Sequence, residues 1–297
     1  MKNKSPLFIG ALLVLLSSCS SKVHFVAWNM EHLAENFGEG CVPRVEEDYT
    51  AMRDFAQTIK ADVVALQEVE SAKAVARVFP EEDWNIIVSD RPASRSYDCR
   101  GNDQKSTQQR VGLAIRKGVN YQEVGGFKEL ALDREGLRYG LVVKVFHRKD
   151  TVEVMSVHLK SGCFVEDYST STRRACETFE QQVPILDAWV EARIKENRPF
   201  VVLGDFNHRI ANPKNKFWQE LTEMEGQPVV LGNSMKDLKG CHPRYPEPID
   251  HIVMGAGAEN MQVLGSETVY YFPSKTGPMT EEEMLSDHCP IGVTLKL

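Results

Sequence analysis

The sequence predicts a layered α/β domain in which strands are buried by helices. Nine apolar, β-branched runs of four to nine residues have the length and composition of strands. Between some of these runs, apolar residues recur at helical spacing. The composition, 42% hydrophobic and 26% charged, is that of an ordinary globular protein, and no linker-like stretch divides residues 22–297. One domain is therefore the simplest interpretation.

The expected elements follow one another along the chain. Strands are predicted at 23–28, 63–66, 84–88, 111–115, 141–146, 152–159, 200–203, 249–254 and 291–297. Helices are predicted at 49–59, 179–194 and 217–224, because apolar residues there share one helical face. The polar stretch 89–110 has no strand signal, and loops of this length are usually functional or mobile. Its five basic and three acidic residues suit either a phosphate-binding surface or an ordinary soluble loop.

The N-terminus has the features of an export signal. Lys2 and Lys4 precede an apolar run at 7–16, which is too short for a good membrane span. Removing these two lysines from 35 basic residues leaves 33 against 42 acidic ones, a formal charge of −9. A chain this acidic is not a general nucleic-acid-coating module. It can still act on nucleic acid through a local basic patch, or bind divalent cations.

The letters LSSC at 16–19 resemble the lipobox of bacterial lipoproteins, whose cysteine becomes the lipidated first residue. We therefore expect a signal peptide at 1–18, a lipid anchor at Cys19 with a tether over 19–22, and the folded domain at 23–297. Ser20 stands where an inner-membrane retention signal has aspartate, which favours the outer membrane of a bacterial cell envelope. The alternative is a plain signal peptide with an incidental cysteine.

Six cysteines remain once Cys19 is assigned to the anchor. An even number in an exported chain indicates disulfides. Cys163 and Cys176 bracket a short polar loop and are the favoured pair. The pairs Cys41–Cys99 and Cys241–Cys289 follow by elimination, and the alternative is that some cysteines are buried free thiols.

Polar side chains recur at the ends of six apolar segments. They are Asn29, Glu68, His158, Asp205 with Asn207, Asp250, and Asp287 with His288. One such residue is more often a cap or a surface group, but six segments of this kind are hard to assign to turns. Carboxylate and amide oxygens suit Mg²⁺, Mn²⁺ or Ca²⁺. Histidines beside carboxylates can serve as general acids or bases.

In order along the chain, the letters WNM, LQE, HLKSG, GDFN, IDHI and SDHCPI resemble the motifs of the endonuclease/exonuclease/phosphatase superfamily. That superfamily includes pancreatic-type deoxyribonucleases, AP endonucleases, inositol polyphosphate 5-phosphatases and neutral sphingomyelinases. The resemblance spans residues 25–297. It implies a four-layer α/β sandwich, with two mostly antiparallel sheets packed face to face and helices outside. It also implies divalent-metal-dependent cleavage of a phosphoester by water.

The resemblance further implies roles for individual residues. Glu68 is the main expected metal ligand, with Asn29 beside it and Asp287 in support, and Mg²⁺ is the expected ion with Mn²⁺ or Ca²⁺ possible. Asp205 is expected to orient the attacking water and Asn207 to hold a phosphate oxygen. His288, paired with Asp250, is expected to bind the scissile phosphate or transfer a proton, and His158 matches the second catalytic histidine of deoxyribonuclease-like members.

One position departs from the pancreatic-type pattern. A glutamate orients the second histidine in those enzymes, whereas Gln109 occupies the matching place here. Glutamine can hydrogen-bond His158 but cannot stabilise an imidazolium by charge, so phosphate contact is the safer role for His158. Lys160 is either a phosphate contact or a charged strand end, and Arg110 either holds phosphate or pairs with an acid.

Two further histidines are left outside the expected site. No family role matches His208, which we expect to be a solvated loop residue. Strand alternation points His251 away from the site, so a structural role is expected. Trp28 is expected in the core.

The leading functional hypothesis is a nuclease acting on DNA, anchored to a membrane by its N-terminal lipid and monomeric. The alternative enzyme acts on phospholipid, sphingomyelin or inositol phosphate. A non-catalytic binding protein on the same fold is a third reading, but such a module does not need Glu68, Asp205, Asn207, Asp250 and His288 together.

Overall fold

Two six-stranded sheets form the centre of the computed structural model, which describes residues 22–147, 149–274 and 277–297. The first sheet has the order β13 (Thr268–Val269), β14 (Ile291–Lys296), β1 (Lys22–Leu33), β2 (Val63–Val69), β4 (Arg110–Arg116), β3 (Trp84–Val88). The second has the order β11 (Gly232–Asn233), β12 (Asp250–Gly255), β8 (Phe200–Asp205), β7 (Asp150–His158), β6 (Gly140–His147), β5 (Asn120–Phe127). Neighbouring strands are antiparallel except for β1 with β2 and β7 with β8. The predicted mostly antiparallel sheets are confirmed.

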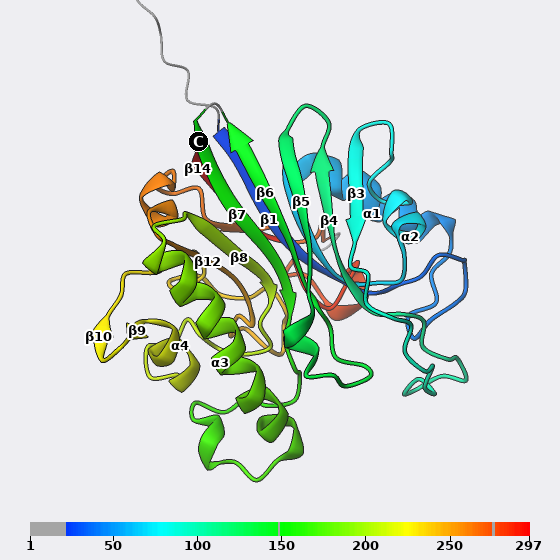
Figure 1. Ribbon diagram of the computed structural model, residues 1–297. Helices are drawn as coiled ribbons and strands as arrows, with labels where there is room; N and C mark the ends of the chain where they lie inside the picture. Colours follow the sequence, from blue (N-terminus) through cyan, green and yellow to red (C-terminus); the bar gives the residue numbers. More distant parts are fainter. Residues whose placement is uncertain (1–21, 148, 275–276) are drawn as a thin grey trace, which may run out of the picture.

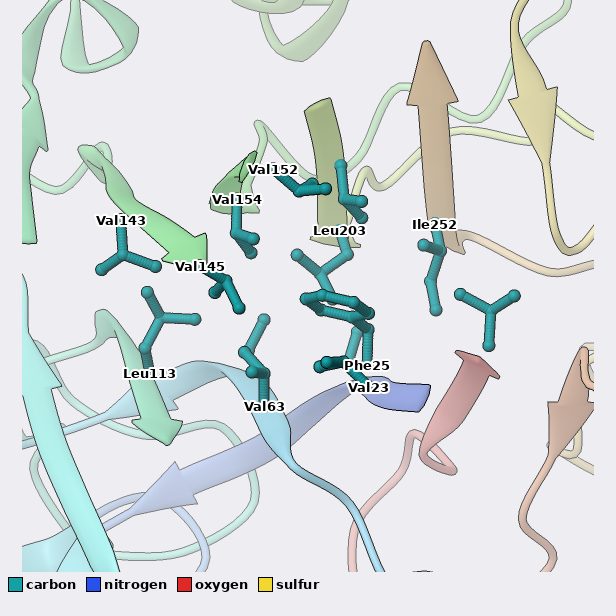
Figure 2. Packing of buried hydrophobic residues seen from close by; sticks show 14 of the residues in the cluster. Val23, Phe25, Val63, Leu113, Val143, Val145, Val152, Val154, Leu203 and Ile252 are labelled. Carbon is teal, nitrogen blue, oxygen red and sulfur yellow. The ribbon is translucent and has the colours of Figure 1, made fainter. Parts of the chain in front are cut away.

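The main core lies between the two sheets. Alternate residues of each strand point inward, as the pleat requires. Figure 2 shows Val143, Leu203 and Ile252 of the second sheet facing Leu113 and Phe25 of the first. All five side chains are fully buried. This apolar layer holds the two sheets face to face.

Helices cover the outer faces of both sheets. The helices α1 (Glu46–Ile59) and α2 (Ala72–Ala76) lie on the outer side of the first sheet, and α3 (Arg174–Lys195) and α4 (Lys216–Leu221) lie on the outer side of the second (Figure 1). Tyr49, Met52 and Phe55 form the buried face of α1. The predicted four-layer α/β sandwich is therefore confirmed. Trp28 is buried in the layer beneath α1, as expected.

The predicted elements are all present, with boundaries that differ by a few residues. The structure adds the edge strand β5. Its hydrophobic pattern does not predict a strand, because it contains the pair Gly125-Gly126 and its Val124 is exposed. Short pieces complete the chain, namely the hairpin of β9 (Glu223–Met224) and β10 (Gln227–Pro228) and the 3₁₀ turns at Lys128–Ala131, Tyr168–Thr170, Ala258–Met261 and Glu281–Glu283. No helix in the described ranges is long and apolar enough to cross a membrane. The expected signal peptide and Cys19 lie outside the described residues.

Three disulfides join Cys41 to Cys99, Cys163 to Cys176, and Cys241 to Cys289. All three predicted pairs are thus confirmed. The first pair ties the long loop 89–110, which contains one isolated bridge between Asp98 and Lys105, to the segment after β1. Its cysteines are 58 residues apart, so in the loop-entropy model the cross-link stabilises the fold by about 4 kcal/mol.

Candidate active site

Three predicted catalytic residues form one row across the second sheet. His158 at the end of β7 pairs with Asp205 at the end of β8, and Asp205 pairs with Asp250 at the start of β12. Residues directly opposite on neighbouring strands carry their side chains on the same face. His158 Nε2 lies 3.4 Å from Asp205 Oδ2. Sheet register therefore brings together side chains that are 92 residues apart in sequence.

The loop before β14 adds His288 to this row. His288 Nδ1 lies 2.6 Å from Asp250 Oδ2, which confirms the expected pairing. Ser286 holds the loop in place by donating to the Asn29 carbonyl at 2.5 Å. Burial by itself lowers the pKa of His288, but the charge and hydrogen bond of Asp250 outweigh it and raise this pKa well above its ordinary value. His288 is thus held as an imidazolium by its carboxylate partner.

Asp205 is almost fully buried and held from three directions. Asn29 Nδ2 donates to Asp205 Oδ2 at 3.1 Å across the two sheets, and Asn207 Nδ2 donates to the same oxygen at 2.8 Å. The Asn207 backbone N–H donates to Asp205 Oδ1 at 2.7 Å. Burial raises the pKa of Asp205 to about 7, and the charge of Asp250 acts in the same direction. The intervening Phe206 is buried on the opposite side, beneath α3 and α4.

Gly204 explains how β8 delivers Asp205 so close to its neighbours. Its φ is +137°, and a Cβ there would lie 2.2 Å from the Val157 carbonyl and 2.8 Å from Gln67 Nε2. Only glycine fits this backbone conformation and this approach. Gln67 in turn donates to Ser156 at 3.2 Å, which links the two sheets directly beneath the site.

Glu68 reaches the site from the first sheet through a strand irregularity. The register of β2 against β4 shifts between Leu66 and Val69, and Glu68 has a φ of +59°. A non-glycine residue in this region is strained and often functional. Glu68 Oε1 then lies 3.8 Å from His158 Nε2. The backbone N–H of His32 donates to Glu68 Oε2 at 3.2 Å.

Glu31 is a candidate residue that the sequence analysis missed. Its Oε2 accepts the Asp287 backbone N–H at 3.0 Å, and buried Arg44 lies 3.8 Å away. Burial raises the pKa of Glu31 to about 7, and Asp287 and Glu68 add to the effect. Glu31 is two residues after Asn29, but its φ of +46° breaks the regular strand alternation, so sequence spacing did not predict its position.

Gln109 has a different role from the one expected. It donates to Glu68 Oε2 at 2.8 Å and lies 2.9 Å from His32 Nε2, while its carbonyl accepts from Arg138 at 2.5 Å. It therefore supports Glu68, and His158 Nδ1 has no hydrogen-bond partner among the described residues. Burial, followed by the charge of Arg138, lowers the pKa of His158 well below its ordinary value. His158 is thus a neutral imidazole.

The two predicted phosphate contacts have different surroundings. Arg110 donates to the backbone carbonyls of Glu70 at 2.5 Å and Arg91 at 3.3 Å, a geometry that favours a structural role. Lys160 is bonded to the Ser161 carbonyl at 2.6 Å, at the edge of the site. Burial, then the charge of Arg138, lowers the pKa of Lys160. Arg138, which the sequence analysis missed, donates to Gln109, and its charge acts on both His158 and Lys160.

The expectation for His208 is wrong. His208 is fully buried, and its ring stacks on Phe179 with centroids 3.9 Å apart. Asn215 Nδ2 lies 3.3 Å from His208 Nδ1. The His208 backbone carbonyl lies 2.9 Å from His251 Nε2. Burial lowers the pKa of His208 to about 4, and the charges of His251 and Arg209 act in the same direction. Turn residues usually face solvent, but the helices α3 and α4 cover this turn. His251 is also buried, which agrees with its expected structural role.

The catalytic residues described above line a cavity of about 780 Å³. Its catalytic end is lined by Glu68, His158, Asp205, Asn207, Asp250, Asp287 and His288. Its other walls come from segments next to the three disulfides, including Arg100, Phe164 and His242. The disulfides therefore hold the rim of the cavity.

The donor set suits a hard divalent cation. A carboxylate oxygen of Asp205 and one of Asp250 lie within 4.8 Å of each other. Asp250 Oδ1 is buried and has no hydrogen-bond partner in the described part of the chain. Glu68 and Asp287 add carboxylates at the same cavity. Because so many oxygen donors converge in one buried place, a cation of the Mg²⁺, Mn²⁺ or Ca²⁺ type fits the residues present.

The fold has close structural relatives. Xenopus laevis APE2 catalytic domain matches with a TM-score of 0.59 and 17% identity, covering 92% of each chain. Truncated Caenorhabditis elegans TDP2 matches with a TM-score of 0.61 and 12% identity, covering 93% of this chain and 98% of that one. The 3′ phosphatase NExo from Neisseria matches with a TM-score of 0.58 and 14% identity, covering 93% and 100%.

Comparison with curated protein sequences found no match. The model of the endonuclease/exonuclease/phosphatase family, however, matches residues 26–288. That range contains the row on the second sheet, the strained Glu68 and the Asp250–His288 pair. The chain therefore belongs to the endonuclease/exonuclease/phosphatase family.

Proposed function

We propose that the protein is a divalent-metal-dependent phosphodiesterase that hydrolyses DNA. The main support is the row of His158, Asp205 and Asp250 on the second sheet. His288 is hydrogen-bonded to Asp250, and Glu68 faces this row from the first sheet. This arrangement places carboxylates, an imidazolium and a neutral imidazole around one point. A scissile phosphodiester needs such a mixture of cationic, donor and acceptor groups.

The cation would be held by Glu68 and Asp287, with Asn29 beside them and Glu31 as an additional carboxylate. When bound, it would stabilise the negative charge that develops on the phosphate in the transition state. Asn29 Nδ2 donates to Asp205 Oδ2, and Asn29 Oδ1 accepts the Glu31 backbone N–H at 3.0 Å. Asn29 therefore orients the Asp205 carboxylate and holds the backbone at Glu31.

The other residues act on water and phosphate. Asp205 is fixed by Asn29 and Asn207, so its carboxylate can accept a hydrogen bond from the attacking water and orient it. Asp250 occupies His288 Nδ1, which leaves His288 Nε2 to donate to a phosphate oxygen. Neutral His158 contributes a second N–H to the phosphate.

The roles of Asn207 and Lys160 follow from their contacts. Asn207 Nδ2 donates to Asp205 and, at 3.2 Å, to the Leu159 carbonyl. To contact a phosphate oxygen, Asn207 would therefore have to give up one of these two hydrogen bonds. Lys160 and Arg138 are the cations at the His158 side, and we assign them to the flanking phosphates in preference to Arg110. They give a local positive surface to a chain of net charge −7.

DNA is preferred among phosphodiesters for two reasons. Arg100 lines the cavity, and Lys160 and Arg138 lie beside the site, so several cations are available to a chain of phosphates. The related Neisseria 3′ phosphatase was solved bound to a product DNA hairpin. Phospholipid, sphingomyelin and inositol phosphates remain the competing substrates for the test.

The test is hydrolysis by the purified chain of plasmid DNA, RNA, sphingomyelin and inositol phosphates, with Mg²⁺ or with chelator. We expect DNA cleavage with Mg²⁺ and none with chelator. His288→Ala should abolish cleavage, whereas Asp54→Asn, an exposed position on α1, should leave it unchanged. Lipid hydrolysis without DNA cleavage would overturn the choice of substrate, and full activity of His288→Ala would overturn the site.

We also propose that the protein is a monomeric lipoprotein of a bacterial outer membrane, anchored through Cys19. Its support is the sequence of residues 1–20 alone. Growth with a labelled fatty acid should label the wild-type chain and leave Cys19→Ala unlabelled. A wild-type chain that carries no label and stays out of the membrane fraction would contradict this proposal.

A further inference from the structure

The loop 236–248 forms one wall of the cavity, beside the catalytic residues. It lies between β11 and β12, and Cys241–Cys289 joins it to the residue directly after His288. Gly240, His242, Tyr245 and Pro248 all line the cavity with the catalytic residues. The loop is thus covalently attached to the catalytic centre, although it contains none of the family motifs.

Two rings stand together on this loop. The His242 and Tyr245 ring centroids are 4.8 Å apart, with the planes inclined by 38°. Tyr245 is 62% exposed, which is unusual for a large ring that lines a cavity. The exposed part of the Tyr245 ring is accessible to a ligand in the cavity, while the Arg244 guanidinium lies over the ring.

Several contacts order the loop around these two rings. The Tyr245 backbone N–H donates to the His242 carbonyl at 3.1 Å, and the Gly240 N–H donates to the Pro246 carbonyl at 2.8 Å. Arg244 forms an ion pair with Glu281 and places its guanidinium 5.7 Å from the Tyr245 ring centroid. Together with the disulfide, these contacts order the loop backbone that carries the two rings, which lowers the entropy cost of binding.

We propose that His242 and Tyr245 form a stacking platform for an unpaired nucleobase next to the scissile phosphate. This inference rests on the proposed nuclease function and names the form of its substrate, a single-stranded or frayed end of nucleic acid. Every base has a π-face, so an aromatic platform binds bases with little sequence preference.

The rest of the wall agrees with a base as the occupant. Met235, Val269 and Ile291 add an apolar floor to the cavity. A base inside a duplex is already stacked on both faces, so it cannot use the platform without leaving the helix. The Arg209–Glu247 ion pair also lines the cavity, so a polar pair lies beside the apolar and aromatic part of the wall.

The experiment measures affinity for two fluorescently labelled oligonucleotides of equal length and charge. One is a thymidine oligonucleotide and the other carries tetrahydrofuran residues in place of the nucleosides. Binding of the full chain is measured by fluorescence anisotropy in chelator, so that hydrolysis is not needed. We expect about 10-fold tighter binding of the oligonucleotide with bases.

Matched variants separate stacking from other effects. Tyr245→Ala should remove the preference for bases and leave affinity for the base-free chain unchanged. Tyr245→Phe, which keeps the ring, should retain the preference. Tyr271→Ala serves as the control, because Tyr271 is an exposed ring of 56% that does not line the cavity. Equal loss of affinity for both oligonucleotides in Tyr245→Ala, or no preference in the wild type, would overturn the proposal.

Failure of this inference differs from failure of the proposed function. DNA cleavage with Mg²⁺ but no preference for bases would support the nuclease function and contradict the stacking platform. Base preference in chelator without cleavage of any nucleic acid leaves the platform standing and removes the nuclease. Tighter binding of sphingomyelin vesicles than of either oligonucleotide would assign the cavity to a lipid and overturn the platform.

Discussion

Replacing Gly204 by alanine tests how the motif GDFN delivers Asp205. Gly204 has a φ of +137°, and its added Cβ would lie 2.2 Å from the Val157 carbonyl of the neighbouring strand. That carbonyl belongs to the β7–β8 ladder and cannot rotate away as a side chain can. The substitution must therefore push β8 from β7 at the position where His158 meets Asp205.

The magnitude has two parts. A non-glycine residue in a sparsely populated backbone region costs about 1–3 kcal/mol. Overpacking against fixed atoms costs about 1–3 kcal/mol more. We therefore expect Gly204→Ala to lower the free energy of unfolding by about 4 kcal/mol, a large fraction of the stability of a typical domain.

The matched control is Gly118→Ala. Gly118 has a φ of +97°, but a Cβ there would have no atom within 4 Å. It therefore incurs the backbone cost alone, about 2 kcal/mol. The assay is urea unfolding followed by tryptophan fluorescence, with midpoints compared at an unchanged denaturant slope. If Gly204→Ala is no more destabilising than Gly118→Ala, the close approach of β7 and β8 does not explain this glycine.

Three further outcomes are expected. Asp250→Asn keeps a hydrogen bond to His288 but loses the charge, so turnover should fall by about 10² to 10⁴ in a steady-state assay, whereas unchanged turnover would argue against the pair. Saturating Mg²⁺ at about 100 times its dissociation constant should stabilise the wild-type chain by about 2.7 kcal/mol in thermal unfolding, and Glu68→Gln should remove that gain. Because the pKa of His208 falls from 6.5 unfolded to about 4 folded, its stabilisation is present above pH 6.5 and is lost as the pH falls. Between pH 7.5 and 5 this loss is about 2 kcal/mol. The free energy of unfolding of His208→Phe should therefore fall less steeply with pH over that range than that of the wild type. An equally steep fall would refute the buried neutral histidine.

Much of the site could be predicted because each motif is local. Asp205 ends β8, and Asn207, just beyond the strand at a φ of +52°, turns back to donate to it, while Phe206 packs on the opposite side. His208 was misjudged because the sequence does not show that α3 and α4 fold over the turn and bury it. Gln109 was misassigned because its partners, Glu68, His32 and Arg138, come from three other segments.

The residues that were missed depend on long-range contacts. Glu31 gains its meaning from Asp287, which is 256 residues away in the chain. His242 and Tyr245 lie on a loop that a disulfide joins to Cys289, next to His288. A polar loop of this kind has no periodicity from which its destination can be read.

By itself, the sequence determined the nine predicted strands, the three outer helices that carry an apolar face, and the polar groups placed at strand ends. These features depend on hydrophobic periodicity and on the backbone preferences of neighbouring residues, which act locally. The tertiary structure alone decided that β7, β8 and β12 lie side by side in register, that Glu68 turns into the site at a strained φ, and that loop 236–248 supplies a wall. Those outcomes depend on which strands pair and which surfaces bury one another, and such contacts join residues far apart in the chain.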